Sequence, residues 1–225
     1  MAEAIASDLD VLDVYADQAW QPDAVMQALL LQDDLEVTLV STRGLERIAS
    51  TTTPQPVVAE VRLSIADWAD LPADPSLLVA VDVNDPGNLG TLARSAVAAG
   101  FDGVVCLGDT VDAFSPKVVR SSAGAMFRVP VMIERDTDAG LQAIGDLGIT
   151  RFGTRMVGAT PCYQADLTSA LALVLGSEAH GLAEGHASHI DQWLAVPMPG
   201  DTESLNVAMA GAILTYETAR QRRTV

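Results

Sequence analysis

The 225-residue sequence is poor in cysteine, in lysine and in aromatic residues. The aromatic residues make up 4% of the chain. Its two cysteines, Cys106 and Cys162, lack the CxxC spacing that holds a metal ion or a redox pair. No apolar run reaches the roughly 18–20 residues of a membrane span, and no charged start followed by an apolar core marks a signal peptide. These absences exclude a CxxC-type metal or redox centre and a membrane-spanning chain, and they predict a soluble, cytoplasmic protein.

Because aromatic residues are scarce, Val, Leu, Ile and Ala must build most of the core of this chain, which is 49% hydrophobic. Such a core suits a parallel sheet covered by helices better than an aromatic-rich β-sandwich. The length allows one large domain, or a small domain joined to a larger one.

Positive charge is also scarce, since the formal net charge is −17 and Lys117 is the single lysine. Neutralising phosphates requires clustered Lys and Arg, so the composition argues against an extended nucleic-acid-binding surface. Residues 1–74 hold fourteen acids against three arginines. We interpret most of these acids as a solvated surface, and binding to a polyanion would depend on a few local arginines, aided by a second subunit.

A polar segment with two prolines at residues 65–76 has the composition of a linker. It predicts a small α/β domain over residues 1–64 and a larger domain over residues 77–225. In the first domain the apolar runs and the intervening segments predict strands at 9–16, 35–41 and 57–63, and helices at 22–31 and 43–49. Residues 2–7 resemble the tail of a helix whose start is absent.

After residue 76, apolar strands alternate with helical patterns, which predicts a mostly parallel sheet. Strands are expected at 77–83, 102–108, 127–133, 149–156, 170–176 and 193–198, and helices at 89–100, 115–126, 137–147 and 204–223. Gly100 suits the left-handed position that ends a helix.

Three segments place polar residues where an apolar strand gives way to a loop or helix: Asn88–Arg94, Gly176–Leu182 and Val196–Asn206. Open α/β sheets gather their ligands at such junctions, so the three segments suggest one composite site. Each segment also has a local explanation. Arg94 could pair with an acid at the end of the sheet, Glu178 could face a helix N-terminus, and Ser204 and Asn206 could be N-caps.

Two further features have plain interpretations. No strand or helix spacing gathers His180, His186 and His189, so they are expected to be solvated rather than to bind a metal. The last helix carries an apolar stripe that packs either into the core or against another subunit. Its members are Leu205, Ala208, Met209, Ala212, Ile213 and Tyr216.

Together the three segments resemble the SpoU (TrmH-like) branch of the SPOUT superfamily, RNA 2′-O-ribose methyltransferases that use S-adenosylmethionine. Asn88–Arg94 matches the family's Asn-x-Gly-x-x-x-Arg. Gly176–Leu182 matches its Gly-x-Glu followed by Gly-Leu, and Val196–Asn206 matches its apolar-Pro-Met followed by Ser-Leu-Asn. The match runs in order over residues 77–220.

The resemblance implies a trefoil-knotted catalytic domain, a homodimer formed through that domain, and a cofactor held in the knot. Arg94 would meet the ribose hydroxyl, either as a base or as a group that orients the hydroxyl or the adjoining phosphate. The other residues that it implies at the reaction centre are Asn88, Glu178, Ser204 and Asn206. Those that it implies around the cofactor are Leu175, Gly176, Val196, Met198 and Leu205, and RNA contacts are assigned to Arg120, Ser121 and Ser122.

The N-terminal residues 1–64 look like the L30e-like substrate-binding domain of several family members, in a shortened or truncated form. This extra domain favours ribosomal RNA over tRNA as the substrate. Two other function classes stay open. One is a hydrolase with Ser177 or Ser204 as nucleophile, although no G-x-S-x-G elbow is present. The other is a non-catalytic RNA-binding or cofactor-binding module of the same fold.

Overall fold

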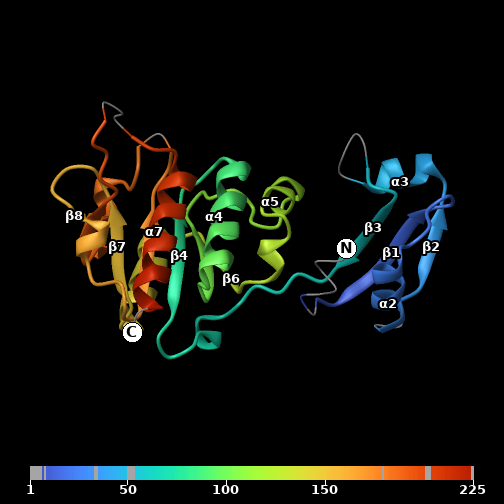
Figure 1. Ribbon diagram of the computed structural model, residues 1–225, viewed down its shortest axis with the longest axis horizontal. Helices are drawn as coiled ribbons and strands as arrows, with labels where there is room; N and C mark the ends of the chain where they lie inside the picture. Colours follow the sequence, from blue (N-terminus) through green and yellow to red (C-terminus); the bar gives the residue numbers. More distant parts are fainter. Residues whose placement is uncertain are drawn as a thin grey trace. The chain divides into compact units, whose positions relative to one another are not determined.

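The computed structural model describes residues 7, 9–32, 35–49, 54–178, 180–200 and 204–223 (Figure 1). The chain forms two compact units, Met1–Ser64 and Ile65–Val225. All of the expected helical tail at 2–7 except Ser7 lies outside the described residues. Within them, no helix is long and apolar enough to cross a membrane.

The first unit is a three-stranded sheet in the order β2-β1-β3 with two helices. Strand β1 runs parallel to β2 and antiparallel to β3. The elements follow the predicted ones closely: β1 Val11–Asp17, α2 Ala24–Gln32, β2 Val37–Val40, α3 Thr42–Ile48 and β3 Val57–Val61. Only a few of its hydrophobic side chains are buried, among them Val14 and Leu45, so its core is thin.

The second unit is built on a seven-stranded sheet in the order β6-β5-β4-β9-β7-β10-β8, in which all strand pairs are parallel. The central strands are buried on both faces, which explains their unbroken apolar sequences. The strands are β4 Ser76–Val81, β5 Gly103–Leu107, β6 Val131–Glu134, β7 Thr150–Thr154, β8 Thr160–Pro161, β9 Leu171–Leu175 and β10 Gln192–Ala195. The two-residue β8 was not predicted.

Helices cover both faces of this sheet, and the alternation along β4 decides which side chain meets which helix. Leu78 and Ala80 pack in one core with α4 (Pro86–Ala99), α5 (Pro116–Ser121) and α7 (Val207–Arg222). Val79 and Val81 point to the other face, where α6 (Thr137–Asp146) closes a second core. Figure 1 shows α4 and α7 beside each other on the first face.

Some predicted elements have other bounds than expected. The helix expected over 115–126 stops at Ser121, because Ala123 and Gly124 adopt left-handed backbone angles (φ 50° and 82°) before the 3-10 turn η2, Ala125–Phe127. Strand β10 ends at Ala195, so Val196–Met198 lie beyond the sheet. Helix α4 begins at Pro86, and its end at Gly100 has the predicted left-handed conformation (φ 76°).

The segment expected as a linker groups with the second unit. The backbone N–H of Ala66 donates to the carbonyl of Val131, and Trp68 and Leu71 pack against the core on the α6 face. The 3-10 turn η1, Trp68–Asp70, is closed by a capping box between Asp67 and Asp70.

Helix α7 buries Ala208 of the predicted stripe, but its other buried residues lie outside that stripe. Val207, Gly211 and Leu214 face the core, and Gly211 allows the backbone of α7 to approach Leu92 and Leu175. Met209, Ile213 and Tyr216 remain 62%, 41% and 70% exposed. A core role is therefore wrong for these three side chains, and an interface role stays a prediction.

Candidate functional site

Two adjoining cavities lie beyond the carboxyl ends of β7, β9 and β10, where a doubly wound sheet gathers its ligands. The larger has a volume of about 470 Å³ and is lined by Gly176, Ser177, Glu178 and Asn206, among others. The smaller, of about 200 Å³, has walls from Leu194, Val196, Met198 and Leu214. Thr154, Gly181, Ser204, Leu205 and Ala210 border both.

A chain of hydrogen bonds joins the three motifs at the larger cavity. The amide nitrogen of Asn88 donates to Oε1 of Glu178 (2.8 Å), and the amide nitrogen of Asn206 donates to Oδ1 of Asn88 (2.9 Å). These contacts link residues 90 and 118 positions apart in sequence. Asn88, Glu178 and Asn206, hereafter the Asn–Glu–Asn cluster, therefore bring the three junctions together in the fold.

Glu178 is a carboxylate at neutral pH. Partial burial raises its pKa, but hydrogen bonds from the Asn88 side chain and from backbone N–H groups, including that of Asp85, together outweigh burial and hold the pKa below its ordinary value. The backbone nitrogen of Asp85 lies 3.3 Å from Oε1. The cluster therefore presents a fixed negative charge beside the larger cavity.

Asn206 is the N-cap of α7 and also contacts Asn88. Its Oδ1 accepts hydrogen bonds from the backbone N–H of Ala208 and Met209 (2.9 and 3.4 Å), which makes it the N-cap of α7. Its amide nitrogen is then free to reach Asn88. Ser204 lies outside the helix and borders both cavities.

The five residues assigned to the cofactor divide between the cavities. Leu175 and Gly176 line the larger one, Val196 and Met198 line the smaller one, and Leu205 borders both. A Cβ at Gly176 would overlap the backbone of Gly181 and Leu182, so only glycine lets these two chain segments cross so closely. Ser177 and Gly181 exchange two backbone hydrogen bonds, which fix the loop between them (3.0 and 2.9 Å).

Arg94 lies apart from the cluster. It follows Asn88 by six residues, so the two side chains leave α4 about 120° apart, and Arg94 is exposed and lines neither cavity. Within the described part of the chain, no hydrogen bond or ion pair holds it, and the expected pairing with a sheet-end acid is absent there.

Of the three residues assigned to RNA, only Arg120 is exposed. The hydroxyl of Ser121 donates to the carbonyl of Pro86 (2.7 Å) and packs on Gly90, where a Cβ would collide with it. Ser122 is fully buried, and its hydroxyl bonds to the carbonyl of Val119 (2.9 Å). Ser121 therefore links α5 to α4, the Ser122 hydroxyl is used within its own turn, and Arg120 remains the candidate for an RNA contact.

The histidines form no metal centre in the described residues, where no cluster of three or more His, Cys, Asp or Glu could hold a metal ion. Sequence reasoning nevertheless missed one pairing. His186 and His189 both contact Oδ1 of Asp138, at 2.6 and 3.3 Å. The hydrogen bond from His186 keeps the pKa of Asp138 below its ordinary value. Ser177 is bonded to the backbone N–H of His180, and no described histidine ring contacts Ser177 or Ser204.

The sequence matches the SpoU rRNA Methylase family over residues 75–216. This chain belongs to that family. RlmP of Bacillus subtilis, named a 23S rRNA (guanosine(2553)-2′-O)-methyltransferase, is 34% identical over 83% of this chain and 73% of its own length. RlmB of Xylella fastidiosa, named a 23S rRNA (guanosine-2′-O-)-methyltransferase, is 35% identical over 85% of this chain and 80% of its own length.

Solved structures agree with the assignment. The SpoU methyltransferase AviRb from Streptomyces viridochromogenes, in complex with AdoMet, aligns with a TM-score of 0.86 and 26% identity over 100% of this chain and 88% of its own. The expected SPOUT fold is thereby confirmed. The chain is a SpoU-type RNA methyltransferase that uses S-adenosylmethionine as methyl donor.

Proposed function

We propose that this protein methylates a ribose 2′-hydroxyl of 23S ribosomal RNA. The observation that carries the proposal is the Asn–Glu–Asn cluster, which brings the three motifs together beside two cavities. The names of RlmP and RlmB support ribosomal RNA as the substrate class. A tRNA substrate is the alternative, and a ribosomal substrate favours a cytoplasmic location.

The cavities fit the two ends of S-adenosylmethionine. The smaller cavity has apolar walls from Val196, Met198 and Leu205, which suit a purine ring. Val196 and Met198 lie outside β10, so their backbone groups are not committed to the sheet. The Glu178 carboxylate beside the larger cavity suits the positively charged sulfonium. Bound there, the cofactor supplies an electrophilic methyl group.

The side chains of this chain then position the acceptor. Asn88 restricts the Glu178 carboxylate, because its amide is itself oriented by the hydrogen bond from Asn206, whose side-chain oxygen caps α7. Ser204 and Asn206 border the space that the target ribose must enter. Arg94 holds the hydroxyl or the adjoining phosphate, since a guanidinium is a permanent cation that positions anions through a planar fork. Orientation of this kind supplies much of the rate in group transfer.

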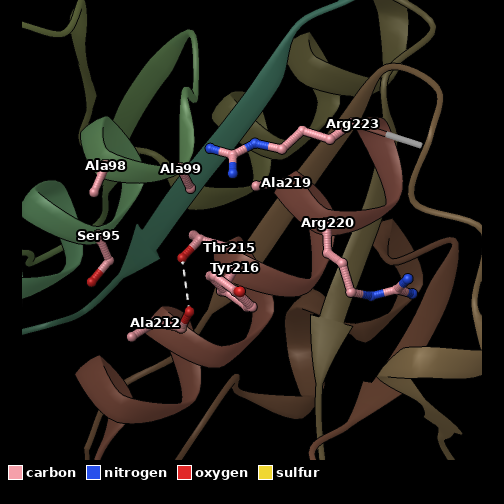
Figure 2. A pocket seen from close by; sticks show the side chains of 9 residues that line it. All are labelled: Ser95, Ala98, Ala99, Ala212, Thr215, Tyr216, Ala219, Arg220 and Arg223. Carbon is pink, nitrogen blue, oxygen red and sulfur yellow. Dashed lines mark hydrogen bonds between the residues drawn. The ribbon is translucent and has the colours of Figure 1, made fainter. Parts of the chain in front are cut away.

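A homodimer is part of the proposal, formed by the exposed ridge of α7. This ridge consists of three exposed side chains, Met209, Ile213 and Tyr216, and a hollow lies on either side of it. The first hollow, about 440 Å³, lies between α4 and α7 and is floored by Ala98, Ala99, Ala212 and Ala219, as Figure 2 shows. A ridge beside a hollow is self-complementary, as a twofold interface requires.

The dimer also accounts for the distance between Arg94 and the cluster. Arg94 lies one turn before Ala98 on the same stripe of α4, and Ala98 lines the hollow of Figure 2. Arg94 therefore borders the surface that the partner would cover. We infer that each Arg94 acts in the cavity of the partner subunit, so that each reaction centre uses both chains.

The N-terminal unit is assigned to substrate RNA. Residues 1–64 form the small α/β domain, residues 65–76 join it to the catalytic domain, and residues 77–225 carry the chemistry. The assignment of residues 1–64 to RNA binding rests on their resemblance to the L30e-like domain. Because the unit is acidic, most of the electrostatic attraction for RNA must come from arginines elsewhere, including Arg94 and Arg120.

Cofactor binding and methyl transfer test the function directly. S-adenosylmethionine is expected to bind the purified protein in the presence of EDTA, because no described residues form a metal site. Calorimetry measures the binding, and transfer of a labelled methyl group to ribosomal RNA and to tRNA measures the activity. Binding without transfer to either RNA would favour a non-catalytic module, and absence of binding at millimolar cofactor would disprove the methyltransferase assignment.

The dimer is tested by its mass and by one substitution. Light scattering is expected to give twice the chain mass of 23.6 kDa. Tyr216→Asp is expected to shift the protein to the monomer, because it places a charge on the apolar ridge, at a residue that lines both hollows. Leu147→Asp, at an apolar residue outside the ridge that is 51% exposed, serves as the control. A monomeric unmodified protein at tens of micromolar would contradict the proposal.

A further inference from the structure

Arg155, the first residue after β7, has an ordered side chain at an exposed position. Its guanidinium carbon lies 4.5 Å from the centroid of the Trp193 ring, and its Nη2 donates to the carbonyl of Gly158 (2.6 Å). Its backbone N–H donates to the carbonyl of Leu194 (3.1 Å). Backbone, ring and carbonyl together hold the guanidinium in one place.

The Trp193 ring is itself fixed by its neighbour in the sheet. Trp193 in β10 stands opposite Gly153 in β7, and the ring fills the space that a side chain at Gly153 would occupy. A Cβ at Gly153 would lie 2.8 Å from the ring. Gly153 therefore lets the indole lie flat on the sheet and serve as a platform for Arg155.

No carboxylate of the described residues pairs with this guanidinium, although the chain carries thirty acidic residues. Arg151, four residues earlier, forms the opposite case, with two hydrogen bonds from its side chain to Asp191 at 2.9 Å. One N–H group of Arg155 donates to Gly158, so most of its five N–H groups and one face of the guanidinium plane remain available to a ligand.

Arg155 lines the smaller, apolar cavity and does not line the larger one, whereas Glu178 lines only the larger. A ligand that spans both cavities with its sulfonium beside Glu178 would have its purine at the Arg155 end. A guanidinium at that end is kept away from the sulfonium, which would repel it. A guanidinium plane also binds the face of an aromatic ring favourably.

We propose that Arg155, held on Trp193, is a positioning residue that covers the adenine of S-adenosylmethionine. The proposal rests on the function proposed above. It makes the adenine end of the cofactor cavity depend on a cation and its aromatic platform, in addition to the apolar wall.

Calorimetry with three ligands tests the contact on the full chain. The ligands are S-adenosylmethionine, S-adenosylhomocysteine and 5′-methylthioadenosine, which share the adenosine, while only the first two carry the amino-acid end. Arg155→Ala is expected to raise the Kd of all three by about tenfold, within the range of a desolvated cation–π contact. Arg155→Lys is expected to restore little, because an ammonium lacks the plane.

Two further variants make the comparison specific. Trp193→Leu removes the platform and is expected to raise the same three Kd values by a smaller factor. Arg135→Ala removes an exposed arginine that bonds one carbonyl and lines neither cavity, and it is expected to leave them unchanged. Arg155→Ala should raise the KM for the cofactor and keep kcat, the KM for RNA and the melting temperature.

Three results would overturn the proposal. If Arg155→Ala raised the Kd of S-adenosylmethionine and S-adenosylhomocysteine but not that of 5′-methylthioadenosine, Arg155 would contact the carboxylate of the amino-acid end. A raised KM for RNA with unchanged Kd values would place it on a phosphate. If Arg155→Ala and the unmodified protein had the same Kd and KM values for every ligand, Arg155 would contact none of them. If the unmodified protein binds none of the three ligands, the proposed function itself fails, and that outcome is recognised before any variant is made.

Discussion

Arg94→Ala is expected to lower methyl transfer by about 10³-fold and to leave the affinity for S-adenosylmethionine unchanged. The affinity is kept because Arg94 lines neither cavity. The rate falls because the guanidinium is the cation proposed to meet the ribose hydroxyl or its phosphate. Arg94→Lys is expected to fail as well, since an ammonium cannot reproduce the planar fork or its reach. Single-turnover transfer at saturating RNA, together with cofactor calorimetry, measures both quantities.

Mixed dimers show which chain supplies the arginine. Asn206→Ala is expected to impair both cofactor binding and transfer, because it removes the N-cap of α7 and the bond to Asn88. If Arg94 acts in the partner's cavity, a dimer of one Arg94→Ala chain and one Asn206→Ala chain has one complete site. Co-purified heterodimers with two different tags should then recover about half of the unmodified activity. If Arg94 acts in its own chain, both sites are incomplete.

A substantially active Arg94→Ala enzyme would show that the arginine is not required for the chemistry. An inactive heterodimer, in a preparation where each single variant is inactive and dimeric, would assign Arg94 to its own subunit. The second result corrects the geometry of the site and leaves the role of the residue intact, so the two experiments separate the proposals.

The core of the site could be predicted from the sequence because of a general property of parallel sheets. The carboxyl ends of β4 and β9 lie side by side in the sheet, so polar residues that follow these strands must meet. Asn88 and Glu178 follow those two strands. Asn206 was expected near the start of the last helix, which was predicted to begin at about Ser204 and begins at Val207.

The remaining parts depend on contacts that no local pattern reveals. The stripe on α7 was recognised as apolar, but periodicity gives a face and does not say what covers it. Ser121 and Ser122 look available for phosphate in the sequence, and only the close packing of α5 on Gly90 shows where their hydroxyls go. Arg155 follows β7 and Trp193 lies in β10, far apart in the sequence, so their stacking carried no sequence signal.

Gly176→Ala is expected to prevent stable folding or to destabilise the catalytic domain by more than about 3 kcal/mol, the upper part of the range for overpacking. Gly176 ends β9 where the chain passes against Gly181 and Leu182, and the added Cβ would overlap their backbone atoms. A flexible side chain could turn away, but the backbone of this loop is fixed by the paired bonds of Ser177 and Gly181. The same crossing forms a wall of the larger cavity.

Gly185→Ala is the matched control, because it lies later in the same connection, in the 3-10 turn η4 (Glu184–His189), and a Cβ there meets nothing within 4 Å. It is expected to change the free energy of unfolding by less than about 0.5 kcal/mol. Chemical denaturation and thermal melting compare the two variants, and calorimetry compares their cofactor affinity. If Gly176→Ala were as stable as Gly185→Ala but bound the cofactor weakly, the close crossing would shape the cavity without supporting the fold. If it matched the control in both measurements, the loop would have to move aside freely, and the fixed crossing inferred from the two backbones would be wrong.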